Sequence, residues 1–159
     1  MERFLATTEE EKTQLGYIAE GELMHLVLSD IERAEDLDKA LNKTLTLRGL
    51  ISSIKEHDKI KKLLERALAN PKAAEWFNGT YRLYNERAIL YSEGESRRPD
   101  RVMINGNTAI VVDYKFARPV EKHKEQVQLY MKLLREIGYR NVKGYLWYVY
   151  KNEILDVLI

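Results

Sequence analysis

A tight turn between two apolar, β-branched segments constrains this chain more than any other feature of its sequence. Asn105-Gly106 separates residues 101–104 from residues 107–112. Asn-Gly in this setting is the strongest short-range signal for a β-hairpin, because both residues tolerate the positive φ of a type I′ turn. We therefore expect two antiparallel strands. The apolar run at 109–112 predicts that the second one is a buried central strand.

The register of this hairpin decides whether three charged side chains meet. With the turn at Asn-Gly, Asp100 lies opposite Val111 and diagonal to Asp113, roughly 7–8 Å away at the backbone. A turn one residue later, at Gly106-Asn107, sets Asp100 directly opposite Asp113, whereas a three-residue loop turns it to the other face. Asp113 and Lys115 share a face because side chains alternate along a strand. In two of the three registers, two carboxylates and one ammonium converge.

Such a cluster is suited to a hard cation and a phosphate. Two crowded carboxylates raise each other's pKa unless a positive charge lies between them. Mg²⁺ prefers oxygen ligands, polarises phosphoryl oxygens and lowers the pKa of bound water. The alternative is a plain carboxylate–lysine salt bridge on an exposed sheet face. The apolar run before Asp113 favours the functional reading, because it predicts that the charges follow a buried strand.

Four motifs in this order resemble those of the RecB-like branch of the PD-(D/E)XK nuclease superfamily, over about residues 20 to 150. Arg98-Pro99-Asp100-Arg101-Val102 resembles its G-x-x-D-R-hydrophobic motif, and Val111-Val112-Asp113-Tyr114-Lys115 its hydrophobic-D-Y-K motif. Gln126-Val127-Gln128-Leu129-Tyr130 resembles its Q-hydrophobic-x-x-Y helix. Residues 21–28, with His25, resemble its upstream G-x-x-x-H-x-x-L helix. One departure is arginine at positions 97 and 98, where many relatives have glycine.

The resemblance implies a metal site and a catalytic lysine. Asp100 and Asp113 would hold Mg²⁺ or Mn²⁺, with His25 as a third ligand and the Tyr114 carbonyl as a fourth. Lys115 would orient or help deprotonate the attacking water and stabilise charge on the phosphate. Without the resemblance, a lone histidine on a helix is more often a packing residue than a ligand.

The resemblance also implies that two residues of the following helix border the active site. Gln126 and Tyr130 are stacked at i and i+4 on one helix face. In the family this pair borders the catalytic centre, where the glutamine contacts metal-bound water or DNA phosphate. The alternative is that Tyr130 is core and Gln126 exposed. Glu86 occupies a position where relatives often place an acid, although a surface or salt-bridging role fits it as well.

Charge is unevenly distributed although the net charge is only +1. Residues 115–143 hold eight bases against three acids, whereas residues 1–40 hold eleven acids against four bases. The basic segment could face phosphate, although solvated helix faces are the commoner explanation. The expected nucleic-acid contacts are Arg101, Lys122, Lys124 and Gln126.

The length and composition of the chain exclude several classes of protein and of active site. The chain has 159 residues, which suits one compact domain, and no cysteine, which excludes disulfides, thiol catalysis and cysteine-held metals. No apolar run approaches a membrane span, and the N-terminus lacks a signal-peptide pattern. We therefore expect a cytoplasmic protein that does not contact membranes and uses no small-molecule cofactor.

The element pattern predicts an α/β fold with a PD-(D/E)XK, restriction-endonuclease-like core. The core order is helix, three strands, helix, strand, after an N-terminal helical subdomain; the subdomain covers residues 1–79 and the sheet core residues 80–159. The expected helices start at Thr7 (or restart after Gly16 or Gly21), near Ala34, near Thr44 and after Asp58. A short turn of helix follows at 72–77. The expected strands lie at 80–91, in the hairpin, at 142–150 and at 154–159, with a helix at 121–137 capped by Gly138.

We therefore expect a metal-dependent DNA exonuclease or endonuclease domain that acts in repair or recombination. The strand at 144–149 resembles that of C-terminal nuclease domains in UvrD-like (RecB/AddA-type) helicase–nucleases, so helicase domains are expected in a longer protein. The chain itself has no P-loop motif. Two alternatives remain: a non-catalytic nucleic-acid-binding module with the same fold, and a free-standing repair or restriction endonuclease.

Overall fold

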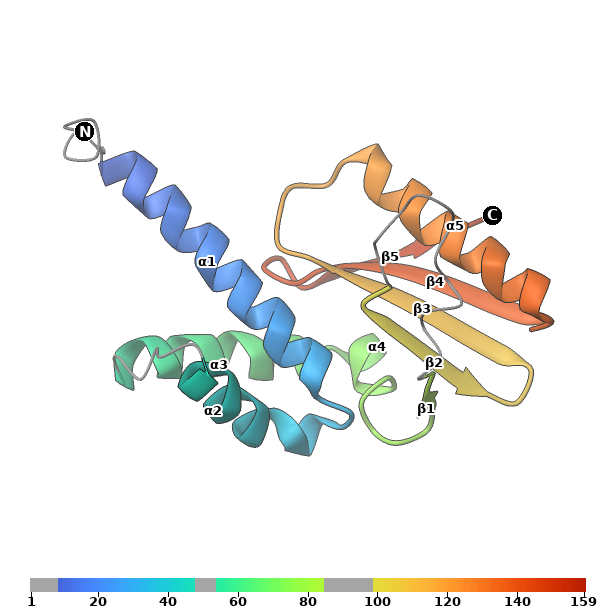
Figure 1. Cartoon of the computed structure of the whole chain (residues 1–159), viewed down its shortest axis with the longest axis horizontal. Coiled ribbons are helices and arrows are strands. Elements are labelled where there is room, and N and C mark those ends of the chain that lie inside the picture. Colours follow the sequence, from blue (N-terminus) through green and yellow to red (C-terminus); the bar gives the residue numbers. More distant parts are fainter. Residues whose placement is uncertain (1–8, 48–53, 85–98) are drawn as a thin grey trace.

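The computed structural model describes residues 9–47, 54–84 and 99–159 of the chain. These residues form the mixed α/β fold that the sequence predicts, with one five-stranded sheet in the order β1-β2-β3-β4-β5 (Figure 1). The elements are α1 (Glu9–Asp30), η2 (Ala34–Asp36), α2 (Leu37–Leu47), α3 (Ile54–Leu68), α4 (Pro71–Ala74), β1 (Arg82–Leu83), β2 (Arg101–Asn105), β3 (Thr108–Lys115), α5 (Glu121–Ile137), β4 (Asn141–Tyr148) and β5 (Glu153–Val157).

The N-terminal helices differ from the expected boundaries. α1 continues through Gly16 and Gly21 without a restart. α2 runs past Thr44, and α3 begins before Asp58, so both expected breaks are wrong. Thr44 is buried on α2, which shows that packing outweighs the local preference of threonine for a helix start. The expected start at Thr7 lies outside the described residues.

The hairpin turn lies one residue later than the preferred position. Asn105 pairs with Thr108, so Gly106-Asn107 forms the turn, which is the second register considered above. Gly106 has a φ of 59°, whereas Asn107 is not among the residues with positive φ. This pattern fits a type II′ turn, which requires glycine at its first central position. The expected type I′ turn at Asn105-Gly106 is therefore wrong. In the observed register, Asp100 lies directly opposite Asp113.

The sheet is covered on both faces. Residues of β2, β3 and β4 alternate between two cores, as expected for strands buried on both sides. α1–α4 pack on one face, against side chains that include Met103, Val112 and Trp147. α5 links the parallel strands β3 and β4 and packs on the other face, against Val111 and Leu146 among others (Figure 1). The charged end of β3 thus lies between two helical layers.

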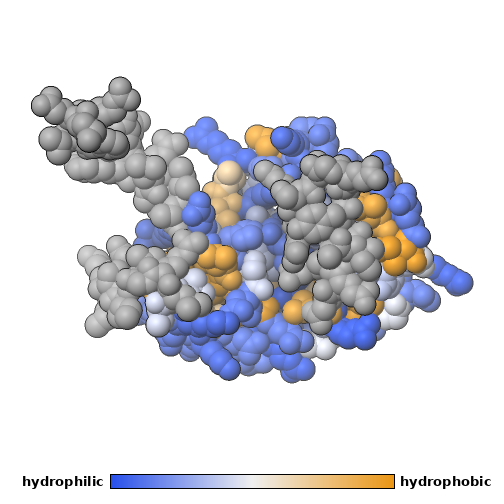
Figure 2. Space-filling view, viewed as in Figure 1, coloured by the Kyte–Doolittle hydropathy of each residue, from blue (hydrophilic) through white to orange (hydrophobic). Residues whose placement is uncertain are grey.

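β1 and β5 form the two edges of the sheet. Only Arg82–Leu83 of the expected strand at 80–91 forms β1, and residues 85–98, with Glu86, lie outside the described residues. The expected last strand at 154–159 forms at Glu153–Val157 as β5, which pairs antiparallel with β4. The described surface is largely hydrophilic on the face shown in Figure 2. No helix in the described segments is long and apolar enough to cross a membrane.

Candidate active site

Two carboxylates meet where β2 begins and β3 ends. The pairing of Arg101 with Val112 places Asp100 and Asp113 opposite each other at the next position. The N–H of Asp100 donates to Asp113 Oδ1 at 3.1 Å, and the N–H of Tyr114 donates to Asp100 Oδ2 at 2.8 Å. Each carboxylate therefore accepts a hydrogen bond from the other's strand, which holds both acids at one end of the hairpin.

In the absence of a cation, the environment of Asp113 makes its ionised form less stable than that of a solvated aspartate. Burial raises the pKa of Asp113 to about 6, and the charge of Asp100 acts in the same direction. The Lys115 ammonium, the Asp100 N–H and His25 oppose this rise. A divalent cation at this position would favour the ionised form, because an opposite charge stabilises a carboxylate.

α1 brings His25 to the same point. His25 Nε2 lies 2.6 Å from Asp100 Oδ1. The imidazole also makes edge contacts with the rings of Tyr114 and Phe116, whose centroids lie 6.0 and 6.4 Å away. The hydrogen bond to Asp100 is the largest cause that raises the pKa of His25, and burial opposes it. Residues 75 positions apart are thus joined.

Lys115 connects the carboxylates to α5. Its Nζ lies 4.0 Å from Asp113 Oδ2 and donates to Gln126 Oε1 at 3.3 Å. The Lys115 side chain is 18% exposed, so the ammonium is largely shielded but still reachable from solvent. The glutamine amide holds the ammonium beside the acid without neutralising it.

The two tyrosines of the motifs are buried. The Tyr114 side chain points away from Asp113, into the core shared with the N-terminal helices, where burial raises the pKa of its hydroxyl. Its ring packs edge-on against His25 and Trp147, and so helps to orient the imidazole. Tyr130 is 3% exposed and belongs to the core beneath α5. This position matches the alternative that Tyr130 is a packing residue.

Arg101 does not occupy a nucleic-acid-binding position, contrary to our expectation. The side chain is 4% exposed. Its guanidinium donates to the carbonyls of Ile31, Glu32 and Trp76 at 2.8, 2.8 and 2.7 Å, and lies over the ring of Phe77. Because these donors are satisfied inside the protein, Arg101 joins the hairpin to the N-terminal helices. The sequence gives no sign of this, since all three acceptors are distant backbone atoms.

The other basic candidates lie at the start of α5. Lys122 is exposed, and Lys124 is half-buried with its Nζ 4.0 Å from Glu121 Oε2. Both lie about one helical turn or less from Gln126, whose side chain contacts Lys115.

A second polar pair, His123 and Tyr148, adjoins the cluster. His123 Nδ1 lies 2.9 Å from the Tyr148 hydroxyl. Tyr148 is the β4 partner of Lys115, and His123 is one turn before Gln126. The i, i+3 spacing of His123 and Gln126 was the available signal, but the role of Tyr148 depends on the pairing of β3 with β4.

The donor set suits a divalent cation, although it is not arranged as a finished site. In the described segments, no three side chains from histidine, cysteine, aspartate and glutamate converge in a geometry that could hold a metal ion. Asp100, Asp113 and His25 nevertheless offer two carboxylates and one imidazole, and the nearest ammonium to the buried Asp113, that of Lys115, lies 4.0 Å from Oδ2. These residues fit a small hard cation by their chemistry.

The family of the protein is shown by a comparison that covers almost the whole chain. The family model of the PD-(D/E)XK nuclease superfamily matches residues 2–156. The chain therefore belongs to this superfamily of nucleases. No curated protein and no solved structure matches it significantly.

Proposed function

We propose that this chain is a metal-dependent deoxyribonuclease of the RecB-like kind. One observation carries this: Asp100, Asp113 and Lys115 lie at one end of a buried hairpin and are joined to His25 and Gln126 by direct contacts. These five polar residues come from α1, β3, α5 and the start of the hairpin, and Asp100, Asp113 and Lys115 are largely buried. Membership of the nuclease superfamily supports the same activity.

Asp100 and Asp113 would hold Mg²⁺ or Mn²⁺, with His25 as a further ligand and the Tyr114 carbonyl as a fourth. When bound, the metal would supply a polarised phosphoryl oxygen and an acidified water. The Tyr114 ring keeps the His25 imidazole oriented, and a fixed ring orientation is what a ligand histidine requires.

Lys115 is the proposed catalytic residue of the chain itself. Its ammonium would donate to a phosphate oxygen or orient the attacking water, and would stabilise negative charge that develops on the phosphate. Gln126 would fix the direction of the ammonium through the 3.3 Å hydrogen bond. Tyr130 would support Gln126 from the core one helical turn away.

The substrate contacts would continue along the start of α5. Lys122 and Lys124 would contact the phosphate backbone beside Gln126, and Glu86 remains a candidate acid of the site. We further propose that residues 1–79 and 80–159 act as helical and sheet parts of one nuclease domain. The domain would be joined to helicase domains in a longer cytoplasmic protein that acts in DNA repair or recombination.

A cleavage assay tests this proposal. Labelled single-stranded DNA, duplex DNA and RNA are incubated with the protein in Mg²⁺, Mn²⁺ or EDTA. We expect cutting of DNA with either metal and none in EDTA. Lys115→Ala should lower the rate by roughly 10²- to 10⁴-fold, while Lys62→Ala, an exposed lysine on α3, should leave it unchanged.

The assay also separates the alternatives. DNA binding with no metal-dependent cutting would mean a binding module and would overturn the proposal. Equal rates for Lys115→Ala and wild type would remove Lys115 from the mechanism.

A further inference from the structure

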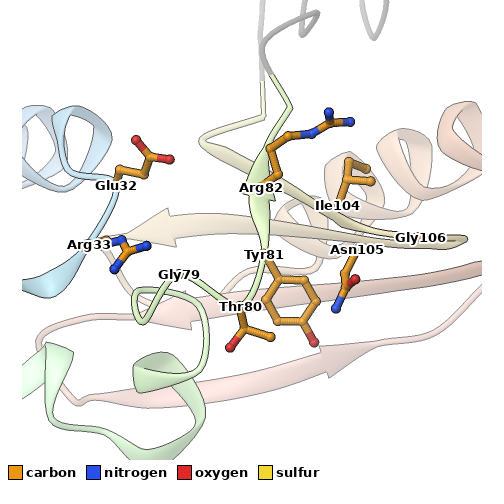
Figure 3. A pocket seen from close by; sticks show the side chains of 9 residues that line it. All are labelled: Glu32, Arg33, Gly79, Thr80, Tyr81, Arg82, Ile104, Asn105 and Gly106. Carbon is orange, nitrogen blue, oxygen red and sulfur yellow. The ribbon is translucent and has the colours of Figure 1, made fainter.

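A polar pocket opens at the edge of the sheet, away from the catalytic cluster. Its volume is about 420 Å³. The turn after α1 forms one wall with Glu32 and Arg33. Gly79, in the loop into β1, and Arg82, the first residue of β1, form another (Figure 3). The end of β2 and its turn close the third side at Asn105. No residue of the proposed active site lines it.

We propose that this pocket binds a backbone phosphate of the same nucleic-acid strand, several nucleotides from the bond that is cut. The inference rests on the proposed nuclease function. Arg33 and Arg82 line the pocket and are both exposed, and within the described part of the chain neither guanidinium forms a salt bridge. Two guanidinium groups against the single carboxylate of Glu32 favour an anion, and guanidinium matches phosphate geometry.

The loop at Gly79 is built to hold Arg33 close. Gly79 has a φ of 86°, and a Cβ at this position would lie 2.6 Å from Arg33 Nη2. The positive φ favours glycine, and any larger residue would also displace the end of the Arg33 side chain. Beside it, the N–H and hydroxyl of Thr80 donate to Asn78 Oδ1 at 3.0 and 2.6 Å, which fixes the loop. The guanidinium is therefore placed along a defined wall of the pocket.

The pocket and the active site lie along one seam between α1 and β2. His25 contacts Asp100 at one end of the seam. Towards the other end, the Glu32 carbonyl accepts from Arg101, and the Glu32 side chain lines the pocket. Asn105 lies five positions after Asp100, which is about 17 Å at roughly 3.3 Å per residue. Phosphates of one duplex strand are spaced about 3.4 Å along the axis and also wind around it, so the two sites would be a few nucleotides apart on a duplex.

Equilibrium binding tests the inference independently of cutting. Fluorescence anisotropy with a labelled 20-nucleotide DNA in EDTA is measured at several salt concentrations. The variants are Arg33→Gln, Arg82→Gln and Glu32→Gln, with Arg66→Gln on α3 as the matched exposed control. We expect each pocket arginine variant to bind roughly two- to tenfold more weakly. The slope of log affinity against log salt should also become shallower by about 1 for each arginine.

Replacing the Glu32 carboxylate should change DNA affinity in the opposite direction to the arginine variants. Glu32→Gln should bind DNA more tightly than wild type, because it removes the one negative charge of the pocket. A general loss of folding cannot produce tighter binding. Equal affinity and equal salt slope for wild type and all three pocket variants would overturn the inference.

Substrate length separates this inference from the proposed function. Arg33→Gln and Arg82→Gln should cut a trinucleotide as wild type does and should lose efficiency only on longer strands. If wild type cuts DNA but the variants match it at every length, the pocket inference fails and the nuclease proposal stands. If the arginines and Glu32 control binding but no substrate is cut, the nuclease proposal fails, while the pocket keeps its role as a binding site for a backbone phosphate.

Discussion

The N–H of Asp100 donates to Asp113 Oδ1 at 3.1 Å, and Asp100 in turn accepts the N–H of Tyr114. Each acid is thus fixed by the backbone of the opposite strand before any cation arrives. The arrangement keeps a buried carboxylate, Asp113, close to a second one, which is unfavourable for the metal-free chain. Holding the two acids in place in the hairpin therefore lowers the folding stability of the metal-free protein.

Asp113→Asn should make the metal-free protein more stable. The pKa of Asp113 is raised to about 6 by burial and by Asp100, so ionisation at pH 8 costs of the order of 1–3 kcal/mol of unfolding free energy. The amide oxygen can still accept the Asp100 N–H. We expect a higher melting temperature than wild type in EDTA, and no further rise when Mg²⁺ is added, as measured by thermal unfolding.

Asp156→Asn, an exposed acid on β5, is the control and should behave as wild type. Lower stability of Asp113→Asn in EDTA would mean that the negative charge itself stabilises the fold, contrary to this account.

Acidification should stabilise the metal-free protein between about pH 8 and 5. Hydrogen bonding to Asp100 raises the pKa of His25, and burial raises that of Asp113. A group whose pKa is raised on folding binds protons more tightly in the folded state, so its stabilising contribution is lost as pH rises through the folded pKa. For Asp113 that loss runs from the ordinary value of 3.8 up to about pH 6, and for His25 it lies above the ordinary value of 6.5.

The measurement is urea unfolding of the wild type and of the His25→Gln, Asp113→Asn double variant in EDTA. The difference in unfolding free energy between the two proteins isolates these groups from all other titrations. A difference that does not change with pH would contradict the assignment.

Gly144→Ala should destabilise the packing of α5 on β4. A Cβ at Gly144 would lie 2.3 Å from Met131 Sδ and 2.7 Å from Val127 Cγ1. Both side chains are buried, so the helix must shift, at a cost of about 1–3 kcal/mol. Chemical denaturation measures the loss. Met131→Ala should partly relieve the effect in the double variant, and Lys143→Ala, an exposed neighbour on the same strand, serves as control.

Arg101→Lys should destabilise the fold without changing DNA affinity. Lysine keeps the charge but cannot reach three carbonyls from one planar group, and the buried acceptors lose bonds of 2.7–2.8 Å. We expect a loss of about 2–4 kcal/mol in unfolding free energy. Arg140→Lys, which is exposed, is the control. An unchanged stability together with weaker DNA binding would restore the original expectation that Arg101 contacts nucleic acid.

Local patterns were sufficient for the elements whose residues interact with close neighbours in sequence. The hairpin of β2 and β3 depends on a glycine-containing turn between β-branched segments. α5 ends where Gly138 adopts a φ of 123°, as the cap predicts. The exact register was less certain, because Asn-Gly and Gly-Asn both make acceptable two-residue turns. The pairing of Asn105 with Thr108 decided between them.

The sequence by itself therefore determined the α/β class, the hairpin and the residue types of the candidate site. Tertiary structure alone decided which of these residues meet. His25 contacts Asp100 across 75 positions, and Arg101 is satisfied by carbonyls about 70 and 25 positions away. Such contacts depend on how α1 packs against the sheet. Local periodicity determines which side of a helix is apolar, but not where on the sheet that side will lie.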